Sequence, residues 1–84
     1  MTVDKIFESL GYRKVDYNSP HTNEVPFFEW WWDKDKERKR IRFVPDSETV
    51  YVVSTYNAHH IPTELSLEEI TAIHMQCTEL GWKV

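Results

Sequence analysis

The sequence predicts an α+β fold, in which a four-stranded antiparallel meander carries an N-terminal and a C-terminal helix on one face. Two observations predict it. A capped amphipathic segment stands near each end of the chain, and four segments rich in β-branched and aromatic residues lie between them, separated by polar turns. The 84 residues suffice for one domain but not for two, so residues 1–84 are expected to form a single domain with the order α-β-β-β-β-α.

The first helix is predicted over residues 2–10, because Thr2 is a suitable N-cap and Gly11 can adopt the left-handed conformation that ends a helix. The last helix is predicted over residues 66–80, where Ser66 and Glu69 have capping-box spacing and Gly81 again follows the final turn. The apolar stripe expected to face the sheet consists of Leu67, Ile70, Ile73, Cys77 and Leu80, which leaves Ala72 and Met75 on the solvent side.

The strands are predicted from runs of aromatic and β-branched residues over 13–17, 25–32, 37–44 and 49–55. Residues 18–23 and 57–64 are expected to be loops, because their composition is polar and contains proline.

Alternation along the strands predicts the pairing register. Trp32 is expected opposite Glu37, which places Trp30 opposite Lys39, and Val44 is expected opposite Thr49. One face of the sheet then collects the apolar set Phe28, Trp30, Trp32, Ile41, Phe43, Val50 and Val52. This face is the predicted core side, and Lys39 is its one charged member.

The opposite face of the sheet is the predicted functional surface. Three arginines in a column stand there between aromatic side chains, and the candidate binding residues are Phe27, Trp31, Arg38, Arg40, Arg42 and Tyr51. Aromatic residues and arginine are enriched in protein interfaces, so we expect a protein partner, with a second copy of the chain as one version. Two alternatives remain open: single-stranded nucleic acid bound on the same face, and a face that is only solvated.

The histidines and the single cysteine form a weaker candidate for a zinc site or a Cys–His enzyme. The residues concerned are His59, His60, His74 and Cys77, with His21 earlier in the chain. Adjacent histidines rarely bind one ion together, and Cys77 lies within the apolar stripe, where a cysteine acts as a small hydrophobic residue. We therefore expect no enzymatic activity, no cofactor and no metal.

Charge is unevenly distributed along the chain, whose net charge is −4. Six of the ten basic residues lie within residues 34–42, and residues 43–82 contain neither lysine nor arginine. This balance argues against general nucleic-acid binding but leaves a local basic stripe. No stretch approaches the roughly 18 apolar residues of a membrane span, and the start of the sequence does not read as a signal peptide, so a soluble cytoplasmic protein is expected.

Most of the chain resembles small uncharacterised proteins encoded by phages and prophages of Gram-positive bacteria. The matching stretches read FESLGYRK from Phe7, IRF from Ile41, LSLEEITAI from Leu65 and ELGW from Glu79. The resemblance implies expression in a bacterial cytoplasm and a role in phage–host interplay through binding. That family has no assigned activity, so the resemblance implies no site residues.

Overall fold

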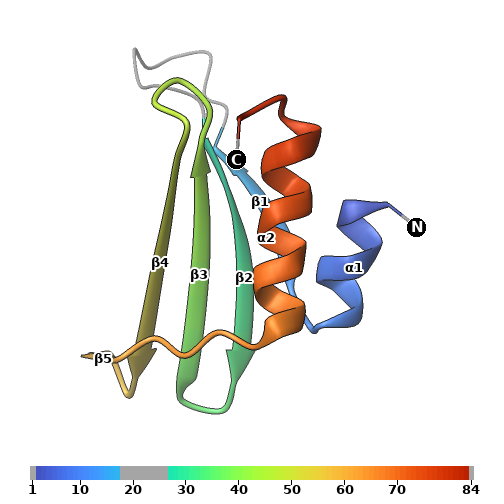
Figure 1. Ribbon diagram of the computed structural model, residues 1–84. Helices are drawn as coiled ribbons and strands as arrows, with labels where there is room; N and C mark the ends of the chain where they lie inside the picture. Colours follow the sequence, from blue (N-terminus) through green and yellow to red (C-terminus); the bar gives the residue numbers. More distant parts are fainter. Residues whose placement is uncertain (1, 18–26, 84) are drawn as a thin grey trace.

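The computed structural model describes residues 2–17 and 27–83, which form two helices and one antiparallel sheet (Figure 1). The elements in chain order are α1 (Val3–Ser9), β1 (Arg13–Tyr17), β2 (Phe27–Lys34), β3 (Glu37–Val44), β4 (Thr49–Tyr56), β5 (His59–Ile61) and α2 (Leu67–Glu79). The α+β class and the terminal helices are confirmed. The predicted loop over 18–23 and His21 lie outside the described residues.

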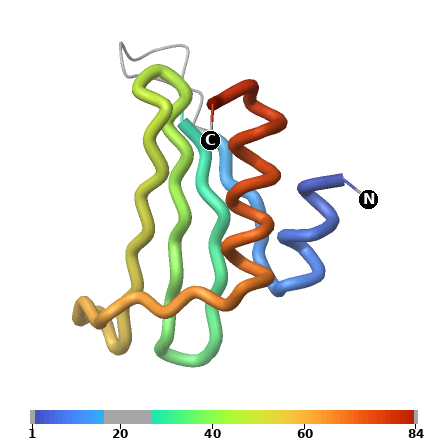
Figure 2. The backbone as a smooth tube through the Cα atoms, in the orientation of Figure 1, coloured from blue at the N-terminus to red at the C-terminus, as the bar shows by residue number. Residues whose placement is uncertain are grey.

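The sheet is a meander in the order β1-β2-β3-β4-β5, so it has five strands where the sequence predicted four. The missed strand, β5, pairs with β4 after a two-residue turn at Asn57 and Ala58, whose φ angles are 51° and 67°. The tube in Figure 2 shows the chain leaving β5 and crossing the end of the sheet to reach α2. Residues 57–64 are therefore a hairpin followed by a crossing segment, not one loop.

The predicted strand pairing is half confirmed. Between β3 and β4, Val44 lies opposite Thr49 as predicted. Between β2 and β3, however, Trp32 lies opposite Lys39 and not opposite Glu37, a shift of two residues. The shift arises because β2 continues to Lys34 and the hairpin turn contains only Asp35 and Lys36. A shift of two keeps every side chain on its predicted face, since side chains alternate with a period of two.

Both helices end in the way that their sequences predict. Gly11 and Gly81 have φ angles of 93° and 81°, and the N–H groups of Tyr12 and Trp82 donate to the carbonyls of Phe7 and Cys77 at 3.0 Å. This is the glycine-terminated Schellman pattern, which satisfies carbonyl groups left open at a helix end. At the start of α2, the capping box between the Ser66 and Glu69 side chains and backbones is complete.

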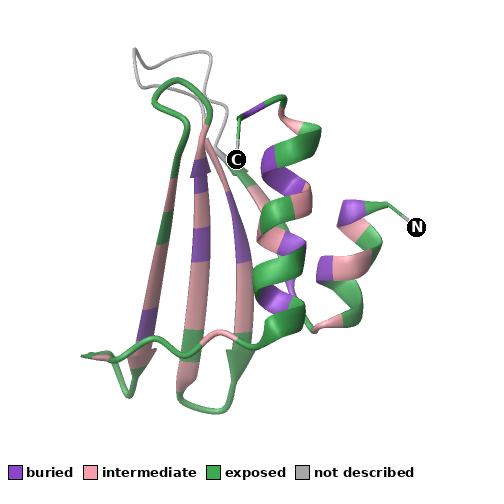
Figure 3. Cartoon of the chain, in the orientation of Figure 1, coloured by how far each residue is buried: buried purple, intermediate pink, exposed green. Residues whose placement is uncertain are grey.

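Both helices pack on the same face of the sheet, which is called the inner face here (Figures 1 and 3). The core lies between the helices and this face. The Phe7 ring of α1 stacks on Trp30 of β2, with ring centroids 4.5 Å apart. The buried apolar residues of this core are Val3, Phe7, Tyr12, Trp30, Ile41, Phe43, Ala72, Cys77 and Trp82.

The predicted buried stripe of α2 is wrong in its first turns. Leu67 and Ile70 are exposed, whereas Ala72, which was placed on the solvent side, is fully buried. The helix is rotated so that two polar residues, Glu69 and Gln76, face the sheet. Both have partners there: Gln76 Oε1 accepts a hydrogen bond from the Trp30 indole at 3.3 Å, and Glu69 accepts several bonds described below.

Candidate functional site

The face of the sheet opposite the helices, called the outer face here, has no helix over it in the described part of the chain (Figure 1). The strand register assigns to it Arg13, Val15, Phe27, Glu29, Trp31, Asp33, Arg38, Arg40, Arg42, Tyr51, Val53, Thr55 and His60. All six predicted binding residues are among them. The structure therefore brings together on one surface the side chains that the sequence placed there.

The pairs formed across the outer face differ from those predicted. Trp31 lies opposite Arg40 and Glu29 opposite Arg42, because of the two-residue shift between β2 and β3. Arg38, which was expected beside Trp31, instead lies opposite Asp33. The predicted pairing of Arg42 with Tyr51 across β3 and β4 is confirmed.

Trp31 is the centre of the outer face, because arginines from both neighbouring strands lie over its ring. The guanidinium carbon of Arg13 in β1 is 4.7 Å from the ring centroid, and that of Arg40 in β3 is 4.2 Å away. A cation over a tryptophan ring is attracted by the negative face of the ring. This attraction holds the three side chains in place relative to one another. Arg13 was not among the predicted binding residues, because the alternation pattern predicts no register for the strand over residues 13–17.

Glu29 is the central residue of the neighbouring row of side chains on the outer face. Its carboxylate is buried and accepts hydrogen bonds from Trp31 Nε1 at 3.0 Å and from Arg42 Nε at 3.0 Å. The Arg42 guanidinium also lies over the Phe27 ring, 4.4 Å from its centroid. Glu29 thus joins Trp31 to Arg42, and contacts within the chain hold both side chains in place.

The strand residues of the outer face are net positive. They include four arginines and only two carboxylates, Glu29 and Asp33, and Asp33 is shared by Arg38 at 3.7 Å and Arg40 at 3.1 Å. Arg13 has no carboxylate partner among residues 2–17 and 27–83. Tyr51 adds an aromatic side chain that is 57% exposed. Basic, aromatic and partly apolar groups are therefore presented on one face of a chain with a net charge of −4.

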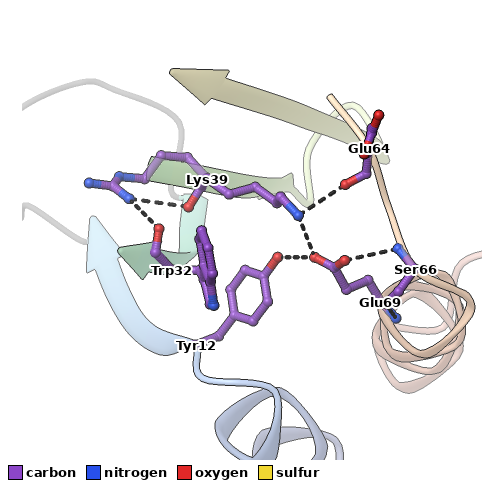
Figure 4. Close-up of polar contacts among 7 residues, drawn as sticks. Tyr12, Trp32, Lys39, Glu64, Ser66 and Glu69 are labelled. Carbon is purple, nitrogen blue, oxygen red and sulfur yellow. Dashed lines mark hydrogen bonds and ion pairs between the residues drawn. The ribbon is translucent and has the colours of Figure 1, made fainter. Parts of the chain in front are cut away.

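A second polar cluster lies on the inner face, where the Glu69 carboxylate joins three parts of the chain (Figure 4). It accepts hydrogen bonds from the Tyr12 hydroxyl, from Lys39 Nζ at 3.0 Å and from the Ser66 N–H at 2.9 Å. Lys39 Nζ also donates to the carbonyl of Glu64 at 3.0 Å. Lys39, the charged member of the predicted core side, is therefore neutralised within the structure.

These contacts shift the pKa values of both acidic groups in opposite directions. Burial acts to raise the pKa of Glu69, but hydrogen bonds from Ser66, Tyr12 and Lys39 outweigh burial and hold the pKa below its ordinary value. Burial, the hydrogen bond to Glu69 and its negative charge all raise the pKa of Tyr12. A charged carboxylate and a neutral phenol are the stable forms, which suits a structural role for the cluster.

The histidines and the cysteine do not come together. His59 and His60 lie on the short edge strand β5, His74 is exposed on α2, and Cys77 is buried in the core. Burial raises the pKa of the Cys77 thiol, which disfavours the reactive thiolate. Within the described ranges, no three His, Cys, Asp or Glu side chains are grouped so that they could hold a metal ion.

A scan against protein-family models and searches of curated proteins and of solved structures found no match to the chain. In the part of the chain that the structure describes, neither helix is long and apolar enough to cross a membrane.

Proposed function

We propose that the protein is a non-enzymatic protein-binding module that uses its outer face. The observation that carries the proposal is the arrangement around Trp31, where arginines on two strands, a buried glutamate and an exposed tyrosine form one ordered, uncovered surface. Aromatic residues and arginine supply much of the binding energy in protein interfaces. Side chains that are ordered beforehand lose less conformational entropy on binding.

The charge of the outer face favours an acidic partner. Since the strand residues of this face are net positive, two copies placed face to face would bring like charges together. An acidic segment of another protein would instead complement Arg13, Arg38 and Arg40. Origin from a phage or prophage, which the resemblance implies, is part of this proposal, and it is compatible with a small binding module.

Single-stranded nucleic acid is the competing ligand for the same surface. A base stacks on a free aromatic face, but arginines from both sides lie over Trp31, so a base would have to displace one of them. Among Phe27, Trp31 and Tyr51, the aromatic residues of this face whose side chains the structure describes, Tyr51 is the most exposed. These contacts favour the protein partner and make nucleic acid an outcome for the test to decide.

The test uses two fluorescent probes, a short peptide rich in glutamate and aspartate and an oligothymidylate. The proposal predicts that anisotropy detects the peptide, that added salt weakens its binding, and that Arg40→Glu weakens it about tenfold or more. Lys83→Glu is the matched control, because it makes the same charge change at an exposed position on the C-terminal segment. Circular dichroism verifies that both variants are folded.

Two results would overturn the proposal. One is equal binding of the peptide by the Arg40→Glu and Lys83→Glu proteins, or no binding at low salt. The other is oligothymidylate binding that competes with the peptide and is the tighter of the two. Light scattering on the same samples identifies the homodimer version, because a dimeric mass that Arg40→Glu reduces to a monomer would assign the face to self-association.

A further inference from the structure

The inner face holds a cavity that the proposed function does not use. It has a volume of about 630 Å³ and is lined in part by the segment between β5 and α2. Figure 2 shows the path of this segment across the sheet. The floor of the cavity contains Glu37, Lys39 and Ser54, and its walls include Ile61, Pro62 and Leu65. The crossing segment is fastened over it by the bond from Lys39 Nζ to the Glu64 carbonyl, 3.0 Å long.

Two polar side chains of this cavity have no partner among residues 2–17 and 27–83. Ser54 is 4% exposed, and its Oγ makes no hydrogen bond. A buried hydroxyl without a partner lowers stability, because its hydrogen bonds to water are lost without replacement. Glu37 is half-buried, and its carboxylate takes part in no ion pair or hydrogen bond within the same ranges. Glu37 is accessible to a ligand, whereas Ser54 Oγ can reach one only after a change of side-chain rotamer.

The charge of the cavity favours a cation. Lys39 is paired with Glu69 at 3.0 Å, so these two charges offset each other, and two further acidic lining residues, Glu37 and Glu64, remain. A metal ion would need more donors than Glu37 and Glu64 provide, and no group of three metal-binding side chains exists in the described part of the chain. Ile61, Pro62 and Leu65 offer apolar contacts for methylene groups beside the polar residues of the lining.

We propose that this cavity binds the primary ammonium group of an aliphatic amine. The ammonium donates hydrogen bonds to the Glu37 carboxylate, and to Ser54 Oγ once the hydroxyl turns to another staggered rotamer. The methylene chain packs on Ile61, Pro62 and Leu65. The amine can come from a free diamine or from a lysine side chain of another protein, since both present the same group.

The experiment titrates the complete protein with putrescine, with an Nα-acetylated lysine amide, and with butanediol as the uncharged counterpart of putrescine. Two-dimensional amide NMR spectra are expected to shift at Glu37, Ser54 and Ile61 with at least one amine and not with butanediol. Tighter binding of putrescine would identify a free diamine as the ligand, and tighter binding of the lysine amide would identify a lysine side chain of another protein. Glu37→Gln is expected to weaken amine binding about tenfold, the loss of one charge-assisted contact.

Matched variants separate this site from the outer face. Glu79→Gln removes a carboxylate at the far end of α2 and is expected to leave amine binding unchanged. Arg40→Glu, which tests the outer face, is also expected to leave amine binding unchanged. Each of the two proposals can therefore fail without the other. Ser54→Ala is a second test of the cavity that keeps Glu37 intact, and it is expected to weaken binding about threefold by loss of one hydrogen bond.

Three outcomes would overturn the proposal. The first is equal amine binding by the Glu37→Gln and wild-type proteins. The second is a set of shifts outside the cavity, or shifts of the same size with butanediol. The third is no shift with either amine, or tighter binding of magnesium ions at the same residues than of the amines.

Discussion

The Tyr12 side chain makes both an aromatic contact in the core and a hydrogen bond to α2. Its ring packs edge-on against Phe7, with centroids 5.7 Å apart, while its hydroxyl donates to Glu69 of α2. Tyr12→Phe keeps the ring and removes the hydrogen bond to a charged acceptor, so the free energy of unfolding is expected to fall by about 1–3 kcal/mol. Urea denaturation measures the change. Tyr56→Phe, at a residue that is 55% exposed, is the control and should leave stability unchanged.

The sequence locates individual residues well where alternation decides their position. Trp30 and Trp31 point to opposite faces as predicted, since each neighbouring residue of a strand must alternate. It fails where a side chain depends on a distant partner. Glu69 was recognised as a capping residue, but its bonds to Tyr12 and Lys39 join residues far apart in the sequence, and no local pattern encodes them.

At the scale of one element, α2 shows why an apolar stripe can misplace a helix face. The predicted stripe buried Ile70 and exposed Ala72, and the structure has them reversed. The sheet offers the helix a tryptophan N–H and a lysine ammonium, and Gln76 and Glu69 bind these groups. A buried donor without a partner is costly, so these bonds fix the rotation of the helix more strongly than Leu67 and Ile70 do.

Two substitutions distinguish the observed face of α2 from the predicted one. Ile70→Ala is expected to change the free energy of unfolding by less than about 1 kcal/mol, because the side chain is 49% exposed and alanine favours helix. Ala72→Leu is expected to destabilise the protein by about 1–3 kcal/mol, because the site is fully buried and packed. Thermal and urea denaturation measure both. The reverse order of effects would support the face that the stripe predicts.

Strand β5 was missed because its signals are weak. It has three residues, two of them histidines, and its turn reads Asn-Ala, where Asn-Gly is the common signal for two left-handed residues. The two-residue error between β2 and β3 has a related cause. Alternation fixes which face a side chain takes but not how long a strand runs, so Asp33 and Lys34 were assigned to the turn.

The turn before β5 allows a test of this explanation. Ala58 has a φ of 67°, a conformation that glycine adopts without steric cost. Ala58→Gly is therefore expected to raise the free energy of unfolding by about 0.5–1 kcal/mol. Asn57→Gly is the matched control, since asparagine already tolerates its φ of 51°, and its effect should be smaller. Equal or lower stability of Ala58→Gly would show that the turn carries no such strain.

For the whole molecule, the sheet separates two surfaces of different character. The inner face receives both helices and contains a largely buried ion pair, Lys39 with Glu69, whereas the outer face presents arginines that remain partly exposed. The acidic excess of the chain thus does not describe the charge of its outer face. Net charge is a poor guide to partners when charges of one sign lie on a single face.

The same ion pair couples the whole fold to pH. Glu69 links α2 to β3 and to the segment between α1 and β1, and its pKa is held below the ordinary value of 4.5. At pH values between the lowered pKa of the folded state and 4.5, the unfolded chain binds more protons than the folded chain. The free energy of unfolding therefore rises with pH in this range. The contribution of Glu69 is complete above pH 4.5 and is lost as pH falls through its lowered pKa in the folded state.

Chemical denaturation from pH 7 to pH 2.5 tests this coupling against two variants. Glu69→Gln is expected to be less stable than the wild-type protein at pH 7, because Lys39 loses its counter-charge, and to show a weaker loss of stability in acid. The two curves should therefore approach each other as pH falls. Glu68→Gln removes the exposed neighbouring carboxylate and should keep the acid slope of the wild type. If Glu69→Gln kept that slope as well, other carboxylates would control the acid stability, and Glu69 would not be the group that joins the helices and sheet.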